Sequence, residues 1–289
     1  MRPEERSGLL YVALAVALFS TSPVLIAWAD PVNPFAKTSG RMLVAAIVML
    51  ITARLFSRGD TAQPTPRSTP RFLGYGLIAA FHFLCYIASL SYTTAAHSLS
   101  IIYTAPIFVT ILSAFILHEP VRKRQWAGVG ITVLGVAIIA GLEPRMTWQM
   151  AFGDALALLS AITFAIYSVA GRYERERYPL LTYASLVYGA AALWMLVPGL
   201  VSLSSTSGAE WGWRQILAIV ALGVGPLAIG HTLYNASLRR VHATYVNIIA
   251  SQEVTGGILL SYLLLSQVPS ANSLVGAVLT LIGIGLVLR

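Results

Sequence analysis

Residues 243–266 read ATYVNIIASQEVTGGILLSYLLLS, an apolar run that is long enough to cross a bilayer. Glu253 falls near the middle of this run. A carboxylate at that depth costs about 2.5–3.5 kcal/mol on insertion scales unless it is paired, hydrated or protonated. The stretch therefore predicts a membrane helix whose carboxylate faces other helices or a water-filled cavity rather than lipid.

Apolar runs of this length recur along the whole chain. The 289 residues are 57% hydrophobic and only 10% charged, whereas a soluble domain carries about 25% charged residues. Membrane spans are expected at about 9–29, 35–56, 72–91, 96–117, 125–142, 152–171, 180–201, 214–237, 243–266 and 271–288. The pattern predicts an all-α integral membrane protein with ten transmembrane helices.

The basic residues indicate how the chain lies in the membrane. The formal net charge is +8, yet these residues occupy short loops and form no stripe of the kind that binds nucleic acid. One side of the predicted membrane holds Arg2, Arg6, Arg54, Arg58, Arg67, Arg71, Arg122, Lys123, Arg124, Arg172, Arg175, Arg177, Arg239, Arg240 and Arg289, and the other holds Lys37, Arg145 and Arg214. By the positive-inside rule, we expect a multi-pass protein of the inner (cell) membrane with both termini in the cytoplasm.

The chain also repeats itself. A shift of 148 positions places the segment YIASL at residues 86–90 over YNASL at residues 234–238. Each half then has five predicted spans, and because five is odd the second half enters the membrane from the opposite side. The sequence therefore predicts two inverted five-helix repeats, residues 1–145 and 146–289. Many secondary transporters build a site near the membrane midplane from such repeats.

Two corresponding segments carry a family resemblance. In the first half Thr94-Ala95-Ala96 precedes Ala105-Pro106 and a turn at Leu117-His118-Glu119, and in the second half His242-Ala243-Thr244 precedes Glu253-Val254 and a turn at Ser266-Gln267. This doubled pattern resembles the EamA-type family of the drug/metabolite transporter superfamily, which has a central Glu-Pro pair and a Gly-Glu-like turn. Here one half keeps the proline and the other keeps the glutamate. The resemblance covers essentially the whole chain and implies secondary transport, usually export, of small metabolites.

Glu253 is the first candidate for a functional group. Its carboxylate could bind a cationic group of a substrate, such as an amine, or take up and release a proton during transport. The structural alternative is a hydrogen-bonded contact that holds this helix against a neighbour. The sequence leaves both interpretations open, and proton coupling is a hypothesis at this point.

Polar and aromatic side chains within the spans complete the predicted binding site. The predicted substrate-binding residues are Glu253, Gln252, Ser251, Asn247, Tyr86, Tyr103, Tyr167, Tyr234, His82 and His231. Asn247 and Ser251 share one helical face, and a polar stripe in lipid has to face other helices or water. Aromatic walls with a few polar groups suit a small-molecule pocket. Alternatively, these groups only hydrogen-bond between packed helices.

Three other ionisable residues in the spans have open roles. His82 and His231 lie near symmetry-related positions and could couple transport to protons or simply pack in the core. Arg41 is near enough to a span end to anchor at the interface or to pair with Asp30, and it could instead bind a substrate carboxylate. The sequence contains no histidine spacing typical of a metal site, and we expect no cofactor.

Prolines predict where the helices bend. Pro23, Pro106 and Pro226 each remove a backbone donor within a predicted span. Freed carbonyl groups near the midplane can bind substrate or absorb bending. We therefore predict hinges at these three positions, although a static kink would give the same pattern.

Glycines of the last span in each half predict a packing face. Gly128 and Gly135 are seven residues apart, as are Gly276 and Gly283, so each pair lies on one helical face. Such faces allow close packing, either within the bundle or between the protomers of a homodimer.

These features predict a secondary active transporter. The leading hypothesis is export of small metabolites such as amino acids, with aromatic amino acids as one possibility, by alternating access. A carrier of nucleosides, organic cations or drugs is the main alternative, and a channel is a weaker one because no charge ring or filter motif is found. We expect no enzyme, because the sequence shows neither a nucleophile–base pattern nor a metal motif. The expected partners are a small-molecule substrate and the lipid bilayer.

Overall fold

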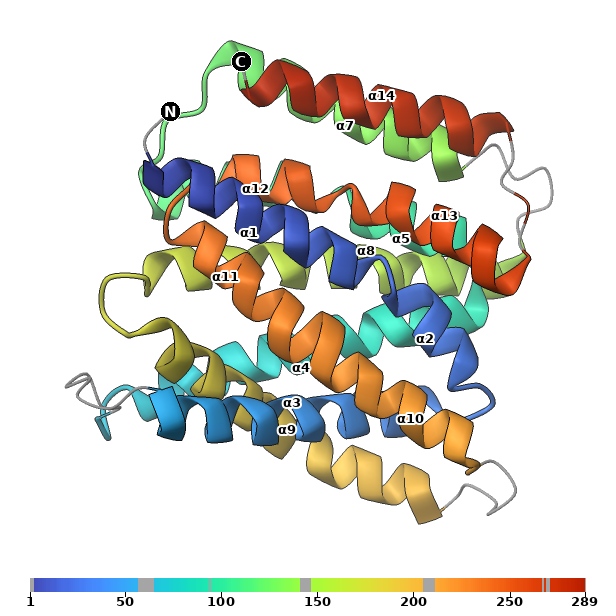
Figure 1. The fold of residues 1–289 in the computed structure, drawn as a ribbon. Coiled ribbons are helices and arrows are strands. Elements are labelled where there is room, and N and C mark those ends of the chain that lie inside the picture. The colour runs from blue at the N-terminus through green and yellow to red at the C-terminus, as the bar shows by residue number, and fades with distance from the viewer. Residues whose placement is uncertain are drawn as a thin grey trace.

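A computed structural model describes residues 3–56, 65–93, 95–140, 147–204, 211–266, 268 and 271–288. All regular elements in these ranges are helices (Figure 1). The predicted boundary between residues 145 and 146 lies outside the described residues, as do Arg2, Arg58, Thr94, Arg145, Gln267 and Arg289.

The helices follow the predicted spans. The first half contains α1 (Pro3–Phe19), α2 (Ser22–Trp28), α3 (Pro34–Phe56), α4 (Thr69–Tyr92), α5 (Ala95–Ile102), α6 (Ala105–Ile116) and α7 (Lys123–Ala140). The second half contains α8 (Trp148–Tyr173), α9 (Leu180–Ser204), α10 (Trp213–Leu222), the π-helix η2 (Gly223–His231), α11 (Thr232–Leu238), α12 (Ala243–Ala250), α13 (Glu253–Leu265) and α14 (Ala271–Leu288). The prediction of an all-helical chain is confirmed.

Seven helical segments among the described residues are long and apolar enough to cross a membrane. They are Pro3–Trp28, Pro34–Phe56, Thr69–Tyr92, Trp148–Tyr173, Leu180–Leu203, Trp213–Leu238 and Ala243–Leu265, and two shorter apolar helices are Ala105–Ile116 and Leu274–Gly283. Membrane crossing by α5–α6, α7 and α14, which would complete the ten spans, stays a prediction.

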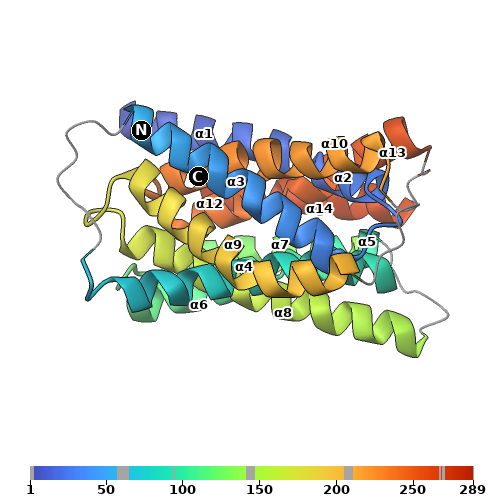
Figure 2. The same cartoon turned by 90° about the horizontal axis from the view of Figure 1, so that it is seen from below.

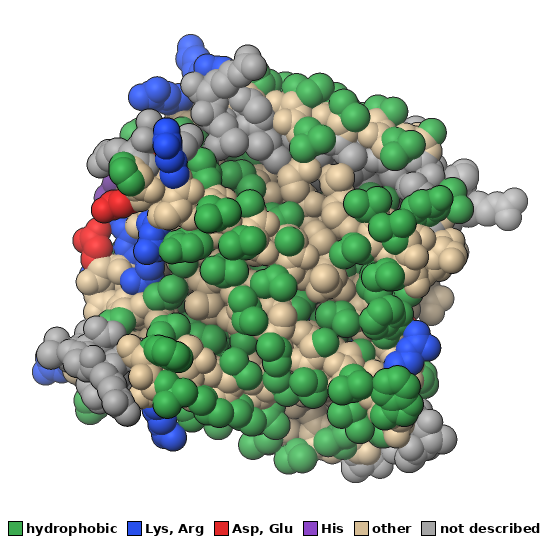
Figure 3. Space-filling model, in the orientation of Figure 1, with side chains coloured by type: hydrophobic (Ala, Val, Ile, Leu, Met, Phe, Trp, Pro, Cys, Tyr) green, Lys and Arg blue, Asp and Glu red, His purple; other side chains and the backbone are tan. Residues whose placement is uncertain are grey.

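The outer surface of the bundle is apolar. Large side chains such as Ile51, Phe115 and Leu263 are more than half exposed, and apolar side chains cover much of the face drawn in Figure 3. Monomeric soluble proteins rarely expose contiguous apolar surface on this scale. Contact with lipid explains this surface, which fits a multi-pass membrane protein.

Helices from the two halves are interleaved. At one edge α7 packs against α14, and at the opposite edge α3 packs against α9 (Figure 1). Between these edges α4 packs against α8, and α1 packs against η2 and α11. Figure 2 shows α1, α10 and α13 along one side of the bundle and α6 and α8 along the other. Thus α1 lies among helices of the second half, and α8 lies among helices of the first.

The glycine face predicted from the sequence is used within the chain. A Cβ atom on Gly283 of α14 would lie 2.7 Å from the backbone nitrogen of Thr132 and 2.8 Å from the carbonyl oxygen of Gly128, both on α7. Because real Cβ atoms do not approach so closely, α7 and α14 require glycine at this contact. The structure thus shows the packing within the bundle, and a homodimer stays a prediction.

A second close helix contact generates a stability prediction. A Cβ atom on Gly76 of α4 would lie 2.7 Å from the carbonyl carbon of Ala190 on α9, whereas one on Gly74 would meet nothing within 4 Å. We expect Gly76→Ala to destabilise the fold by about 1–3 kcal/mol, because the two backbones have to separate. Gly74→Ala, its control on the same helix, should not lower the melting temperature. Thermal unfolding in detergent measures both, and equal stability of the two variants would contradict the packing.

Candidate functional site

Two helix breaks at corresponding positions meet inside the bundle. One span is interrupted between α5 and α6, and another between α12 and α13, so that α6 begins at Ala105 and α13 begins at Glu253. The 148-residue shift places these two residues on each other. Glu253 therefore lies in the first turn of a helix, where unpaired N–H groups and the positive end of the helix dipole favour a carboxylate.

Tyrosines from the first half hold the Glu253 carboxylate. The hydroxyl of Tyr103 donates to Oε2, and the hydroxyl of Tyr86, 3.3 Å away, donates to Oε1. Tyr103 lies at the break before α6, and Tyr86 lies on α4. Only 6% of Glu253 is exposed, so this carboxylate faces the bundle and not lipid.

A small cavity surrounds the carboxylate. It is lined by Phe19, Ser22, Arg41, His82, Phe83, Tyr86, Leu99, Ile102, Tyr103, Phe164, His231 and Glu253. Five of the predicted binding residues are thus brought together here: His82, Tyr86, Tyr103, His231 and Glu253. The cavity has a volume of about 20 Å³, which is room for about one water molecule. A metabolite therefore fits only when the surrounding helices move apart.

The two histidines make different contacts. Nδ1 of His82 on α4 lies 2.9 Å from Oγ of Ser160 on α8, and the His82 ring stacks on Phe164 with centroids 5.0 Å apart. The ring of His231 packs against Phe19 and Phe83, and its Nδ1 has no hydrogen-bond partner among the described residues. His82 therefore joins two helices, while His231 leaves a polar atom unpaired in the cavity wall.

The other predicted binding residues lie outside this cavity lining. Tyr234 donates to Oδ1 of Asn247 over 2.9 Å, and Nδ2 of Asn235 donates to the Tyr167 hydroxyl over 2.5 Å. Ser251 donates to the carbonyl of Ile248 over 2.6 Å, and Gln252 lies at the break before α13. The contacts of Tyr234, Asn247, Tyr167 and Ser251 match the alternative that polar groups hydrogen-bond within and between packed helices.

The structure narrows the roles that the sequence left open for Arg41. An interface anchor and a partner of Asp30 do not fit, because Asp30 pairs with Lys37 and the side chain is buried. Arg41 is only 1% exposed and lies in the cavity wall, with its guanidinium 4.5 Å from the centre of the Phe83 ring. An arginine within an apolar run was the available signal, but its depth depends on how α3 packs. Phe19 and Phe83 of the wall were also missed, because nothing in their sequence context separates them from core residues.

The three predicted hinge prolines lie at irregular helix positions. Pro23 is in the first turn of α2 and Pro106 is in the first turn of α6, each directly after a break. Pro226 lies inside the π-helix η2. These positions fit the loss of a backbone donor, and bending about them during transport stays a prediction.

A larger cavity adjoins the small one. It has a volume of about 670 Å³ and is lined by Pro23, Ile26, Ala27, Asp30, Pro31, Leu90, Ser91, Thr93, Ser261 and Leu265. Ser22 lines the small cavity and its neighbour Pro23 lines the larger one, so the start of α2 lies between them. The lining residues of the larger cavity come from the ends of α2, α4 and α13 that point away from the chain termini (Figure 1).

The opposite end of the bundle is closed by polar contacts around Glu119, which we call the Glu119 cluster (Glu119, Arg172, Leu238, His242 and Ala243). Nε of Arg172 on α8 donates to Oε1 of Glu119 over 2.7 Å, and its Nη1 donates to the carbonyl of Leu238 over 2.6 Å. The backbone nitrogen of Ala243 lies 3.4 Å from Oε2 of Glu119. The cluster therefore joins the loop after α6 to α8 and to the connection between α11 and α12.

His242 lies at the edge of this cluster. Its Nε2 is 3.4 Å from Oε2 of Glu119. Burial lowers the pKa of His242, and the positive charge of Arg172 lowers it further while Glu119 opposes the shift. The ring is therefore neutral at neutral pH, and Arg172 supplies the positive charge that balances Glu119.

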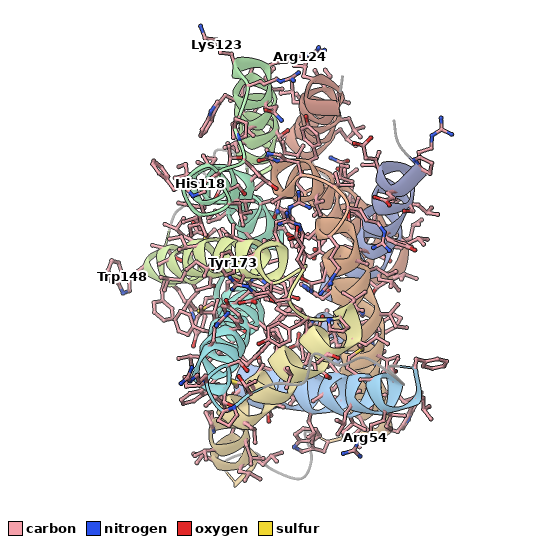
Figure 4. The ribbon with its side chains drawn as sticks, turned by 90° about the vertical axis from the view of Figure 1, so that its left-hand side faces the viewer. Arg54, His118, Lys123, Arg124, Trp148 and Tyr173 are labelled. Carbon is pink, nitrogen blue, oxygen red and sulfur yellow. The ribbon has the colours of Figure 1, made fainter. Side chains whose placement is uncertain are left out.

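Further contacts close the same end. Arg71 on α4 pairs with Glu174 over 2.7 Å, and Arg239 donates to the carbonyl of Tyr178 over 2.7 Å. Figure 4 looks onto this end, where Arg54 of α3 and Lys123 and Arg124 of α7 project outward. One end of the bundle is thus tied by ion pairs, while the other contains the larger cavity.

Comparison with known proteins identifies the family. The EamA-like transporter family matches residues 6–141 and again residues 151–289. The "Uncharacterized transporter YyaM" of Bacillus subtilis is 24% identical, over 87% of this chain and 83% of its own. The "Aromatic amino acid exporter YddG" of Ancylobacter novellus is 26% identical, over 78% of this chain and 77% of its own. The chain therefore belongs to the EamA-like transporter family, a class of membrane transporters.

A solved structure has the same fold. One crystal structure aligns with a TM-score of 0.78 over 97% of this chain and 96% of its own, at 22% sequence identity. At that identity the likeness concerns the fold alone. The helix arrangement described above therefore occurs in an experimentally determined protein.

The Glu119 cluster generates a prediction about the end of the bundle where the chain termini lie. We expect Glu119→Gln to loosen the packing at that end, because Arg172 then lacks its counter-charge. The measurement is the labelling rate of a reporter, Ser237→Cys in a Cys85→Ser background, by a membrane-impermeant maleimide added at this end. Labelling should rise about tenfold, matching the loss of a charged hydrogen bond worth about 1.5 kcal/mol.

The control for this experiment is Glu176→Gln. Glu176 pairs with Arg175 at the same end, but its side chain is 79% exposed, and surface pairs contribute little. Labelling should therefore stay at the parent rate. Equal labelling in the Glu119 and Glu176 variants would show that the cluster does not hold this end closed.

Proposed function

We propose that this protein is a secondary active transporter that exports small metabolites by alternating access, with amino acids as the leading class and aromatic amino acids foremost. The observation that carries the proposal is Glu253, a buried carboxylate at a helix break in an aromatic-walled cavity. Such a group in a membrane protein usually belongs to a substrate or ion pathway. Family membership accounts for transport, and the cavity chemistry accounts for the choice of substrate class.

Two features support amino acids. A carboxylate such as Glu253 suits a substrate ammonium group, and the rings of Phe19, Phe83 and Phe164 suit an apolar or aromatic side chain. A relative with 26% identity is named an aromatic amino acid exporter. Nucleosides, organic cations and drugs are the alternative solutes, and a channel is the weaker alternative mechanism.

The proposal includes ten spans arranged as two inverted repeats, residues 1–145 and 146–289. The family matches the chain twice, once in each half. The packing also corresponds. Within the repeat α1 matches α8 and α4 matches η2 and α11, so the contact of α4 with α8 is the counterpart of the contact of η2 and α11 with α1. The contacts α3–α9 and α7–α14 each join two matching helices. The breaks at Ala105 and Glu253 correspond as well. These correspondences support a pseudo-two-fold axis near the small cavity.

Alternating access is supported by the difference between the two ends. In the proposed orientation both termini are cytoplasmic, and basic side chains gather at the same end of the bundle (Figure 3), as the positive-inside rule requires. The ion-paired end is then the cytoplasmic one, and the larger cavity opens toward the outside. Separation of the ion pairs would expose Glu253 to cytoplasmic substrate, with Pro23, Pro106 and Pro226 as the hinges.

The substrate class is tested by counterflow in proteoliposomes. We expect labelled L-phenylalanine, L-tyrosine or L-tryptophan to accumulate in vesicles preloaded with the same amino acid. Nucleosides and quaternary ammonium compounds serve as the competing panel, and protein-free vesicles serve as the control. Exchange confined to the competing panel would remove amino acids as the substrate class, and single-channel currents would favour a channel.

Proton coupling is proposed at Glu253 and tested by Glu253→Gln. The amide keeps the size and the hydrogen-bond acceptor of the carboxylate but cannot release a proton. We expect net transport driven by a pH gradient to be lost and the pH dependence of exchange to flatten. The control is Glu176→Gln, a change at an exposed side chain, which should behave as wild type. Unchanged net transport and an unchanged pH profile would assign Glu253 a structural role.

A further inference from the structure

Among the described residues, two nitrogens of one cation in the small cavity find no hydrogen-bond partner. Arg41 of α3 is 1% exposed, and its Nε and Nη1 atoms make no hydrogen bond with any described residue. The contact with the Phe83 ring offsets only part of the cost of burying a charge. Arg172 shows the contrasting case, because it is held by Glu119 and a backbone carbonyl. If Arg41 served only to pack the helices, its buried nitrogens would be expected to have hydrogen-bond partners, as those of Arg172 have.

The same cavity contains an anion, Glu253, whose described hydrogen bonds go to tyrosines and not to Arg41. Glu253 accepts hydrogen bonds from Tyr86 and Tyr103, and no ion pair joins it to Arg41 among the described contacts. Both side chains nevertheless line one cavity, with phenylalanine rings in the wall beside them. A cationic donor and an anionic acceptor are thus held apart in an aromatic setting.

We propose that Arg41 binds the carboxylate of a zwitterionic substrate while Glu253 faces its ammonium group. Guanidinium is the side chain best suited to carboxylates, which it binds through strong charge-assisted hydrogen bonds. Each charge of an α-amino acid then meets an opposite charge, and its side chain meets the aromatic wall. The inference rests on the proposed function and narrows it, because amines, nucleosides and organic cations lack the carboxylate that Arg41 needs.

The test compares three probes that share a phenyl ring. L-Phenylalanine has both charges, phenethylamine lacks the carboxylate, and 3-phenylpropionate lacks the ammonium group. In proteoliposomes containing the wild-type chain, we expect L-phenylalanine to exchange, and each truncated probe to compete roughly 10- to 100-fold more weakly than unlabelled L-phenylalanine. That range is expected when a hydrogen bond to a charged group is lost.

Variants assign the carboxylate preference to Arg41. Arg41→Gln should weaken competition by L-phenylalanine by the same roughly 10- to 100-fold and leave competition by phenethylamine unchanged. The ratio between the two probes then approaches one. Arg41→Lys keeps the charge without the planar fork and should give an intermediate ratio. Lys37→Gln is the matched control, because Lys37 is an equally buried cation on the same helix that pairs with Asp30. Its probe ratio should equal that of the wild type.

Each failure has a distinct meaning. If the wild type exchanges phenethylamine as well as L-phenylalanine, or if Arg41→Gln weakens both probes equally, recognition of a carboxylate by Arg41 is overturned while transport itself stands. If the wild type exchanges none of the three probes, the proposed aromatic amino acid class fails together with the inference. If Arg41→Gln does not fold, which thermal unfolding in detergent reveals, Arg41→Lys makes the assignment, and a wild-type probe ratio in that variant overturns the inference.

Discussion

The hydrogen bonds from Tyr103 and Tyr86 to Glu253 are the interaction on which the centre of this bundle depends. They join the break before α6 to the start of α13, which are the corresponding positions of the two halves. A carboxylate in a low-dielectric interior is costly unless donors and a helix N-terminus surround it. Because these donors come from the other half of the chain, the arrangement that accommodates Glu253 also holds the two halves together.

The remaining charges are distributed unequally along the bundle. Ion pairs such as Glu119–Arg172 and Arg71–Glu174 gather at the end where the termini lie, and the larger of the two cavities described above is at the other end. Between them the small cavity holds a hydrogen-bonded carboxylate and a guanidinium with two nitrogens that hydrogen-bond to no described residue. Charged contacts of this kind can break and re-form when helices move.

The candidate site was only partly predictable. Glu253, Tyr86 and His231 stand out in the sequence because ionisable or polar groups within apolar runs have to face protein or water. The same argument also selected Asn247, Tyr234 and Tyr167, since it cannot separate a cavity wall from a hydrogen bond between packed helices. An interface role stayed open for Arg41, because its depth could be judged only from the residue count to the span end. The packing of α3 against α9 and η2 decides that depth.

The sequence by itself determined that the chain is helical, that it lies in a membrane and that it belongs to a transporter family, because apolar run length and doubled motifs are local features. The tertiary structure decided which side chains share a cavity and which end is closed. Contacts such as Tyr103–Glu253 join residues 150 positions apart. Their formation depends on how whole helices pack and on glycine contacts such as Gly76 with Ala190, and neither is encoded within a single span.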